Sequence, residues 1–227
     1  MSDSQRDLTI GFHFDVMCPW AYQTSKWIRE VRATKGFSID WRFFSLEEIN
    51  RSEGKKHPWE REWSYGWGMM RVAAMLRRTS MDDCDRFYEA AGRALHEEGR
   101  KPHRPEVAAE ILSDLGLDPG LVQAAIDDPT TNDEVKADHD TVVSSGGFGV
   151  PTIVFPDGKQ VYGPVVAPAP TGADALALWD LTVAYAKVPF LYEMKTPKSD
   201  ADMIHIGSVF EPYLNARDWE SREKPAR

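Results

Sequence analysis

A cysteine followed by a proline is the residue pair with the clearest capacity for chemistry in this chain. Cys18 and Pro19 stand between an apolar run, Leu8 to Phe14, and a helix-forming stretch that begins at Trp20. At a helix N-terminus, unpaired backbone N–H groups and the macrodipole stabilise a thiolate, and a proline in the first turn has no N–H to lose. The sequence therefore predicts a low-pKa nucleophile at Cys18, in preference to a cysteine that is simply core.

Three polar residues could assist such a thiol. Asp15 lies three residues before Cys18, where it could relay a proton through water or cap the turn into the helix, and the residues favour neither role. His13 and His96 could each donate to a thiolate or an oxyanion, since histidine titrates near neutral pH. A packed or solvated histidine is an equally good interpretation of both.

The second cysteine and the remaining histidines suggest no further chemistry. Cys84 is flanked by aspartates, whose charges oppose thiolate formation, so a structural cysteine on the surface of a helix is favoured over a distant resolving thiol. Two cysteines provide neither a disulfide framework nor a zinc-ligand set, and His103 and His139 have no ligand partner at suitable spacing. No glycine-rich phosphate loop follows a strand, so no metal, flavin or nucleotide cofactor is expected.

Tryptophans at four-residue spacing form a possible aromatic surface. The spaced residues are Trp59, Trp63 and Trp67. On a helix they would share one face, and such a face usually packs in a core. The functional alternative is that part of it roofs the Cys18 site and, with Trp20 and Tyr22, forms a pocket for flat or conjugated substrates.

The first elements must position Cys18. Apolar residues alternate with polar ones from Leu8 to Phe14 and again from Phe37 to Phe43, which predicts two strands. Between them a helix is expected from about Pro19 to Thr34, closed by Gly36. A strand, helix and strand of this length form a βαβ unit, so the two strands should be parallel with a right-handed crossover.

The middle of the chain reads as helical throughout. Helices are expected within Trp59 to Arg78, from Asp82-Asp83 to Gly99, from Pro105 to Gly116, from Asp118-Pro119 onward, and from Thr131 to Val143.

The α/β pattern then resumes. A strand from Val150 to Phe155, a tight turn and a return strand over Gln160 to Tyr162 predict a hairpin, followed by a helix from Gly172 to Ala186. After Thr196 the chain is polar and expected to be only partly ordered. Four of its residues could still dock locally: Val209, Phe210, Tyr213 and Leu214.

Composition limits the partners and the compartment. Of the 227 residues 42% are hydrophobic and 28% charged, and the net charge of −9 argues against nucleic acid or an anionic membrane as partner. The first residues are polar and no apolar run reaches transmembrane length. A cytoplasmic protein is therefore predicted, with no prediction of its oligomeric state.

The order of these motifs resembles the thioredoxin fold, and the helical insertion resembles its DsbA-like branch. That branch includes kappa-class glutathione transferases and 2-hydroxychromene-2-carboxylate isomerases. The chain is most similar to the actinobacterial mycothiol-dependent nitroreductases. The matching stretches are Phe12-x-Phe14-Asp15-x-x-Cys18-Pro19-Trp20, Thr24-Ser25-x-Trp27-Ile28, Trp67-Gly68-x-x-Arg71-Val72-Ala73, Gly92-Arg93-x-x-His96, Val150-Pro151-Thr152-Ile153, Gly163-Pro164-Val165 and Leu178-Trp179-Asp180.

The resemblance implies a domain organisation and a set of binding residues. It divides the chain into a thioredoxin-like domain of residues 1–57 and 147–198, a helical insertion of residues 58–146 and a polar tail of residues 199–227. It implies a cis Val150-Pro151 bond that presses the Val150 backbone against the sulfur, where an ordinary trans proline is the alternative. With the aromatic residues and the histidine named above, the predicted binding residues are Pro19, Trp20, Tyr22, Trp67, His96, Val150 and Pro151.

One departure from the family matters. Where the family motif is Cys-Pro-Trp-Cys, this chain has Ala21, so no second thiol is available there to attack a mixed disulfide. Three interpretations are compatible with this residue: a monothiol cycle resolved by a second small thiol, a non-redox role of Cys18 toward an electrophile, or an engineered cysteine-to-alanine change.

The leading hypothesis is a DsbA-like monothiol oxidoreductase. Cys18 would work with a low-molecular-weight thiol such as mycothiol or glutathione, in thiol-disulfide exchange or thiol-dependent reduction of a small electrophile, with Asp15 assisting proton movement. The alternatives are a thiol-dependent isomerase or S-transferase with no net redox change, and a binding protein that has lost catalysis.

Overall fold

The computed structural model describes residues 8–217 and is built around a four-stranded sheet of order β2-β1-β3-β4. The strands are β1 (Thr9–Phe14), β2 (Ser38–Phe43), β3 (Thr152–Val154) and β4 (Gln160–Tyr162). β1 and β2 are parallel and α1 (Pro19–Lys35) connects them, which confirms the predicted βαβ unit. β3 is antiparallel to both β1 and β4. The α/β, thioredoxin-like fold class predicted from the sequence is therefore confirmed.

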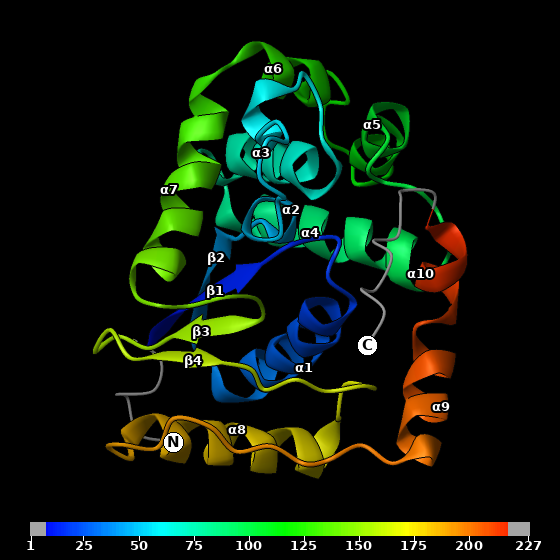
Figure 1. Ribbon diagram of the computed structural model, residues 1–227. Coiled ribbons are helices and arrows are strands. Elements are labelled where there is room, and N and C mark those ends of the chain that lie inside the picture. The colour runs from blue at the N-terminus through cyan, green and yellow to red at the C-terminus, as the bar shows by residue number, and fades with distance from the viewer. Residues whose placement is uncertain (1–7, 218–227) are drawn as a thin grey trace.

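Helices cover the sheet on both sides. Figure 1 shows α1 and α8 (Gly172–Lys187) below the sheet and the helices of the middle segment above it. The indole of Trp27 on α1 donates to the Ala175 carbonyl of α8 at 2.9 Å, and the ring of Phe14 on β1 stacks on Tyr88 at 3.8 Å. Because both faces are covered, the alternating polar residue His13 is as fully buried as its apolar neighbours.

The chain between β2 and β3 is helical, and the five helices expected from the sequence are present, preceded by a short helix and a 3-10 turn. It contains α2 (Leu46–Ile49), a 3-10 turn (Pro58–Glu60), α3 (Tyr65–Arg77), α4 (Met81–His96), α5 (Pro105–Asp114), α6 (Leu121–Asp127) and α7 (Thr130–Ser144). The helix expected to begin at Asp118-Pro119 begins at Leu121, because the Asp118 carboxylate accepts the Gly120 N–H at 2.8 Å and closes a turn before it.

The prediction that Trp59, Trp63 and Trp67 share one helix face is wrong. Trp59 lies in the 3-10 turn, Trp63 lies in the connection that follows, and α3 begins only at Tyr65. A Cβ on Gly68 would come within 2.5 Å of the Trp63 ring, so the glycine lets that ring pack flat on the helix. The three indoles therefore lie on three different backbone segments: the 3-10 turn, the connection and α3.

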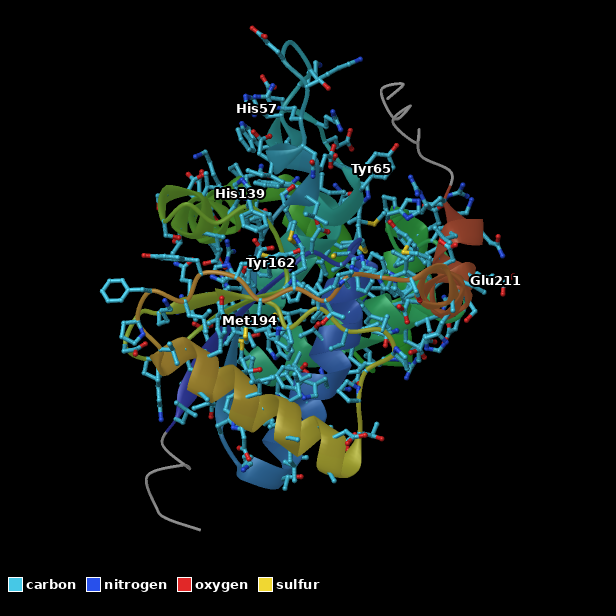
Figure 2. The ribbon with its side chains drawn as sticks, turned by 60° about the horizontal axis from the view of Figure 1, so that its bottom comes forward. His57, Tyr65, His139, Tyr162, Met194 and Glu211 are labelled. Atoms are coloured by element: carbon cyan, nitrogen blue, oxygen red, sulfur yellow. The ribbon has the colours of Figure 1, made fainter. Side chains whose placement is uncertain are left out.

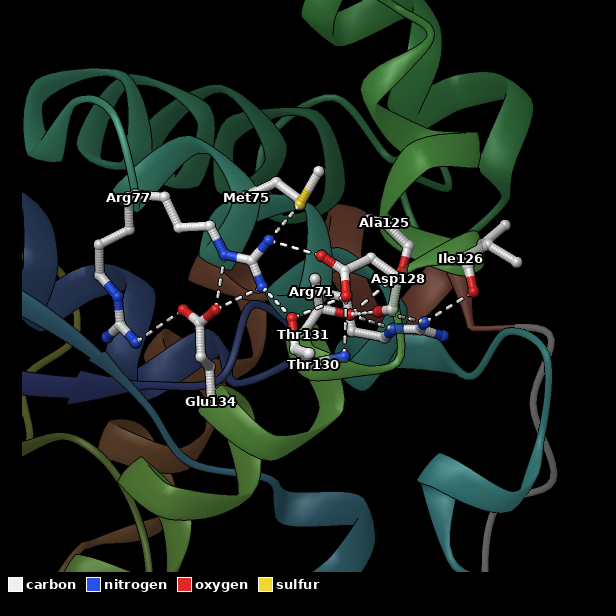
Figure 3. Close-up of polar contacts among 10 residues, drawn as sticks. Arg71, Met75, Arg77, Ala125, Ile126, Asp128, Thr130, Thr131 and Glu134 are labelled. Atoms are coloured by element: carbon white, nitrogen blue, oxygen red, sulfur yellow. Dashed lines mark hydrogen bonds and ion pairs between the residues drawn. The ribbon is translucent and has the colours of Figure 1, made fainter.

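A buried arginine on α3 holds neighbouring helices of the middle segment together. The Arg71 guanidinium on α3 is 3% exposed and donates to Thr131 Oγ1 at 2.8 Å and to the Ile126 carbonyl at 2.9 Å. Figure 3 shows Arg71 with Thr131 and Ile126, and the neighbouring Arg78 pairs with Asp128 at 2.6 Å and with Glu134. These bonds satisfy the carbonyls at the end of α6 and hold α6 and α7 against α3.

The C-terminal region is more regular than expected. α9 (Asp200–Val209) and α10 (Glu211–Ala216) replace a partly ordered tail, because Ser199 and Asp202 form a reciprocal capping box at the start of α9. Local docking is confirmed for Phe210, which is 7% exposed, and for Tyr213, whose ring lies 5.1 Å from that of His96. The rest of the predicted tail, residues 218–227, lies outside the described residues. No helix within residues 8–217 is long and apolar enough to cross a membrane.

Candidate active site

Cys18 occupies the N-cap position of α1, as the sequence predicts. Its backbone is extended, Pro19 takes the first helical turn, and the Ala21 N–H donates to Sγ at 3.4 Å. On the other side the Cys18 thiol donates to the Val150 carbonyl at 3.8 Å. The Val150-Pro151 peptide bond is cis, as the resemblance implies. The structure thus places two parts of the chain that are far apart in sequence on either side of one sulfur.

The low pKa predicted for Cys18 is wrong for this conformation. The residue is only 4% exposed, within a small cluster of Ala21, Phe44, Val142 and Val150. Burial raises the pKa of the Cys18 thiol to about 12, and the Ala21 N–H offsets only part of this effect. Desolvation of the thiolate outweighs the helix N-terminus, since burial disfavours the charged form.

Asp15 is a buried carboxyl that takes the capping role, one of the two roles left open by the sequence. Its two oxygens accept the Met17 N–H at 2.9 Å and the Leu46 N–H at 2.7 Å, so it caps the turn before Cys18 and anchors α2. Burial raises the pKa of Asp15 to about 6, against the lowering effect of these two hydrogen bonds. A Cβ on Gly66 would lie 2.2 Å from Asp15 Oδ1, so only glycine fits beside it.

Two of the predicted binding residues support the site from beneath. Tyr22 is 2% exposed, stacks on His96 at 4.9 Å and donates to the Glu97 carboxylate at 2.9 Å. The His96 ring bonds the Val16 carbonyl through Nε2 at 2.8 Å, and burial lowers the pKa of His96 to about 4. A neutral His96 therefore fixes the backbone just before Cys18.

Other candidates are not brought to the sulfur. Trp67 belongs to the main hydrophobic core and donates its indole N–H to Asn132 at 2.7 Å, so the core interpretation holds for it. His13 is buried in the sheet, and burial lowers its pKa to about 4. Cys84 is fully buried in the main core and burial raises its pKa to about 12, so the favoured structural role holds but the expected position on a helix surface is wrong.

Sequence reasoning missed the residues that bury Cys18. Phe44 follows the second strand directly, and Val142 lies in the last turn of α7. The two adjacent phenylalanines at positions 43 and 44 were a usable signal, because neighbours at a strand end point to opposite faces. No local pattern shows that Val142 reaches the same sulfur.

The aromatic cavity lies beside this cluster rather than over Cys18. It is an open groove of about 370 Å³ whose polar and aromatic lining includes Glu48, His57, Trp59, Lys136, His139 and Asp140. Figure 2 shows His57 and His139 on the same side of the molecule. The His139 ring packs on Phe44 at 4.6 Å, so Phe44 separates the groove from the thiol. Within residues 8–217 no three side chains are grouped to hold a metal ion.

The fold and the Cys18 site together define a thioredoxin-fold protein of the DsbA-like branch. Within that class the chain belongs to the Rv2466c-like family, whose model is described as "Mycothiol-dependent nitroreductase Rv2466c" and matches residues 17–196. The chain is 55% identical over 213 residues to "Uncharacterized protein Rv2286c" of Mycobacterium tuberculosis (strain ATCC 25618 / H37Rv), which covers 94% of this chain and 92% of the relative.

Solved structures show the same fold at low sequence identity. The 2-hydroxychromene-2-carboxylate isomerase superposes with a TM-score of 0.57 at 15% identity, over 78% of this chain and 93% of that chain. The cytosolic disulfide reductase DsbM from Pseudomonas aeruginosa with GSH gives a TM-score of 0.55 at 14% identity, over 78% and 100% of the two chains. At such low sequence identity, these structural matches establish the fold that holds Cys18 but imply no reaction.

Proposed function

We propose that this protein is a monothiol oxidoreductase in which Cys18 reacts with a low-molecular-weight thiol. The observation that carries the proposal is the position of Sγ, which lies between the Ala21 N–H and the Val150 carbonyl with no second cysteine in the motif. Membership of a family described as mycothiol-dependent favours mycothiol over glutathione as the partner. Free thiols and a small-thiol partner fit a reducing compartment, which the cytoplasm supplies.

The cycle needs two molecules of the small thiol. The Cys18 thiolate attacks the small-thiol sulfur of a mixed disulfide between the small thiol and a substrate, forms its own mixed disulfide with the small thiol and releases the reduced substrate as its thiolate. A second small thiolate then attacks the mixed disulfide, regenerates Cys18 and leaves as the small-thiol disulfide. In reduction of a small electrophile, two small thiols supply the two electrons and end as one disulfide. The fully buried Cys84 takes no part in resolution.

The remaining residues bind and support. Pro19, Trp20, Val150 and Pro151 would contact the small thiol or the substrate, while Tyr22 and His96 hold the Cys18 turn. Above pH 6 the Asp15 carboxylate would accept the proton that leaves the thiol, since its pKa of about 6 lies in the working range of a general base.

The experiment is intact-mass spectrometry with mycothiol disulfide and glutathione disulfide over a range of pH. A single adduct on Cys18 that free small thiol reverses would support the monothiol cycle. The adduct should be lost in Cys18→Ser and kept in Cys84→Ser, the matched control. Absence of an adduct from the wild-type protein at every pH would overturn the proposal.

A second candidate is a thiol-dependent isomerase or S-transferase. The raised pKa of Cys18 favours it, because a thiol that stays protonated can position a bound small thiol without changing redox state. Turnover would then give an isomer or a thioether, with no disulfide consumed. The third possibility, a binding protein, predicts ligand binding that survives Cys18→Ala.

A further inference from the structure

The C-terminal segment, residues 188–217, returns to the Cys18 end of the molecule. Figure 1 shows the chain after α8 running back along that helix to α9, which leads up to α10 against the end of α4. The Tyr213 ring on α10 lies 5.1 Å from His96 on α4, and Gly99 approaches the Pro212 carbonyl. The segment therefore docks where His96 and Tyr22 support the active-site turn.

Trp20 lies between this segment and the thiol. One part of its side chain packs against the buried cluster around Cys18. Its ring meets the edge of Phe210 at 4.8 Å and 90°, and Lys198 Nζ lies 5.9 Å from the ring centre. Edge-on aromatic contacts and a cation over an indole both favour one fixed ring position.

The described part of the segment attaches through few buried side chains. Within residues 188–217 the buried side chains are Phe210 and Ala216. Large apolar side chains elsewhere in the segment remain exposed: Phe190 at 86%, Tyr192 at 83%, Ile204 at 75% and Met203 at 55%. A segment that buries so little apolar area has a low free energy of local opening.

We propose that Phe210 is a positioning residue that holds Trp20 as a cover over Cys18, and that release of the C-terminal segment makes the thiol reactive. The proposal rests on the proposed function only in taking Cys18 as the reacting thiol. Opening would return water to Sγ while the Ala21 N–H and the helix N-terminus stay in place. Cys18 would then be a hydrated thiol at a helix N-terminus, the setting in which the sequence predicts a reactive cysteine.

The titratable groups around the thiol come from several elements. Asp15 precedes α1, Tyr88 lies on α4, Tyr162 on β4 and Tyr213 on α10, and each interacts electrostatically with Cys18. Opening removes Tyr213 and the part of the burial that Trp20 supplies, whereas Asp15, Tyr88 and the rest of the cluster around Cys18 stay in place. Burial is the largest cause of the raised pKa of Cys18, so the pKa should fall when the segment leaves.

The test is the rate of alkylation of Cys18 by iodoacetamide, measured by peptide mass mapping as a function of pH. Phe210→Ala should raise the rate at pH 8 by about tenfold or more, which is one unit of thiol pKa, and move the midpoint of the pH profile downward. Phe210→Tyr, which keeps the ring, should restore the wild-type profile. Leu214→Ala on the same helix is the control, because Leu214 is 48% exposed.

The fully buried Cys84 reports global unfolding in the same sample. Labelling of Cys18 in Phe210→Ala at the wild-type rate would overturn the proposal. If Phe210→Ala unfolds, the alkylation rates of Cys18 and Cys84 in the wild-type protein test the proposal instead. Local opening predicts alkylation of Cys18 at least about tenfold faster than that of Cys84, and equal rates would mean that both wait for global unfolding. Iodoacetamide requires no small-thiol partner, so failure here is distinguishable from failure of the proposed cycle.

Discussion

Cys18 and Cys84 form an internal comparison of two buried thiols near helix starts. Burial raises the pKa of each to about 12. Cys18 is the N-cap of α1, where the Ala21 N–H points at its sulfur, whereas Cys84 lies inside the first turn of α4 with its own N–H bonded to the Ser80 carbonyl. Proximity to a helix start is therefore insufficient, because only the cap position directs free N–H groups at the side chain.

The two thiols also differ in the side chains that bury them. Cys84 belongs to the main core, which contains most of the buried side chains of β1, α3 and α4. Cys18 belongs to a separate small cluster whose edge is formed by the partly buried Trp20 and Leu46. Equal burial in this structure can thus conceal unequal access, and the comparison predicts that chemistry is confined to Cys18.

The largest expected effect comes from exchanging the sulfurs for oxygen one at a time. Cys18→Ser should abolish the small-thiol adduct, because serine cannot form a mixed disulfide. Cys84→Ser should retain the adduct with a small loss of stability from a polar group in the core. Intact-mass spectra of both variants decide this, and an adduct that persists in Cys18→Ser would move the chemistry to Cys84.

A second change would convert the monothiol site into a two-cysteine site. Ala21→Cys places a second thiol on the residue whose backbone N–H already donates to Cys18 Sγ at 3.4 Å. With oxidised small thiol, the variant should lose two hydrogen atoms as an internal disulfide in place of a lasting adduct. Mass spectrometry after alkylation distinguishes the two products. A stable mixed disulfide on Ala21→Cys would contradict the prediction, because it would show that a thiol at position 21 does not attack the mixed disulfide.

Asp15 should make the stability of the folded protein depend on pH. The pKa of Asp15 is raised to about 6 in the folded protein, above its unfolded value, so the folded state holds the proton longer. The free energy of unfolding should therefore fall by about 3 kcal/mol as pH rises from about 4 to 7.

Asp15→Asn should remove this pH dependence, and urea unfolding at several pH values measures it. Asp133→Asn, at an exposed position of α7, should leave the dependence unchanged. In Asp15→Asn the pH profile of Cys18 alkylation should also shift downward, because the negative charge that raises the Cys18 pKa is gone. An unchanged profile would exclude Asp15 from proton movement at Cys18.

The smallest predicted effect concerns the packing beneath the Cys18 turn. A methyl group on Gly66 would meet Asp15 Oδ1 at 2.2 Å, so Gly66→Ala should destabilise the protein by about 1–3 kcal/mol. Its displacement of Asp15 should increase labelling of Cys18 more than labelling of Cys84. Gly207→Ala on α9 is the control, since nothing lies within 4 Å of its added Cβ. Thermal unfolding with site-resolved alkylation compares the two variants.

The sequence predicted most of the elements but placed the aromatic residues poorly. The strands, α1 and the closing helix follow from alternation, capping and a proline at N1, which act between near neighbours. The tryptophan spacing failed because Pro58 starts a separate turn and α3 begins six residues after Trp59. Period alone does not show where one helix stops and another begins.

For the active site, the sequence by itself determined that Cys18 caps a helix next to a proline and lacks a second cysteine at position 21. Only the tertiary structure decided the state of that thiol. Phe44, Val142, Val150 and, through Trp20, Phe210 come from distant parts of the chain to bury it. Solvation of a charge depends on everything packed around it, whereas a helix cap depends on a few successive residues.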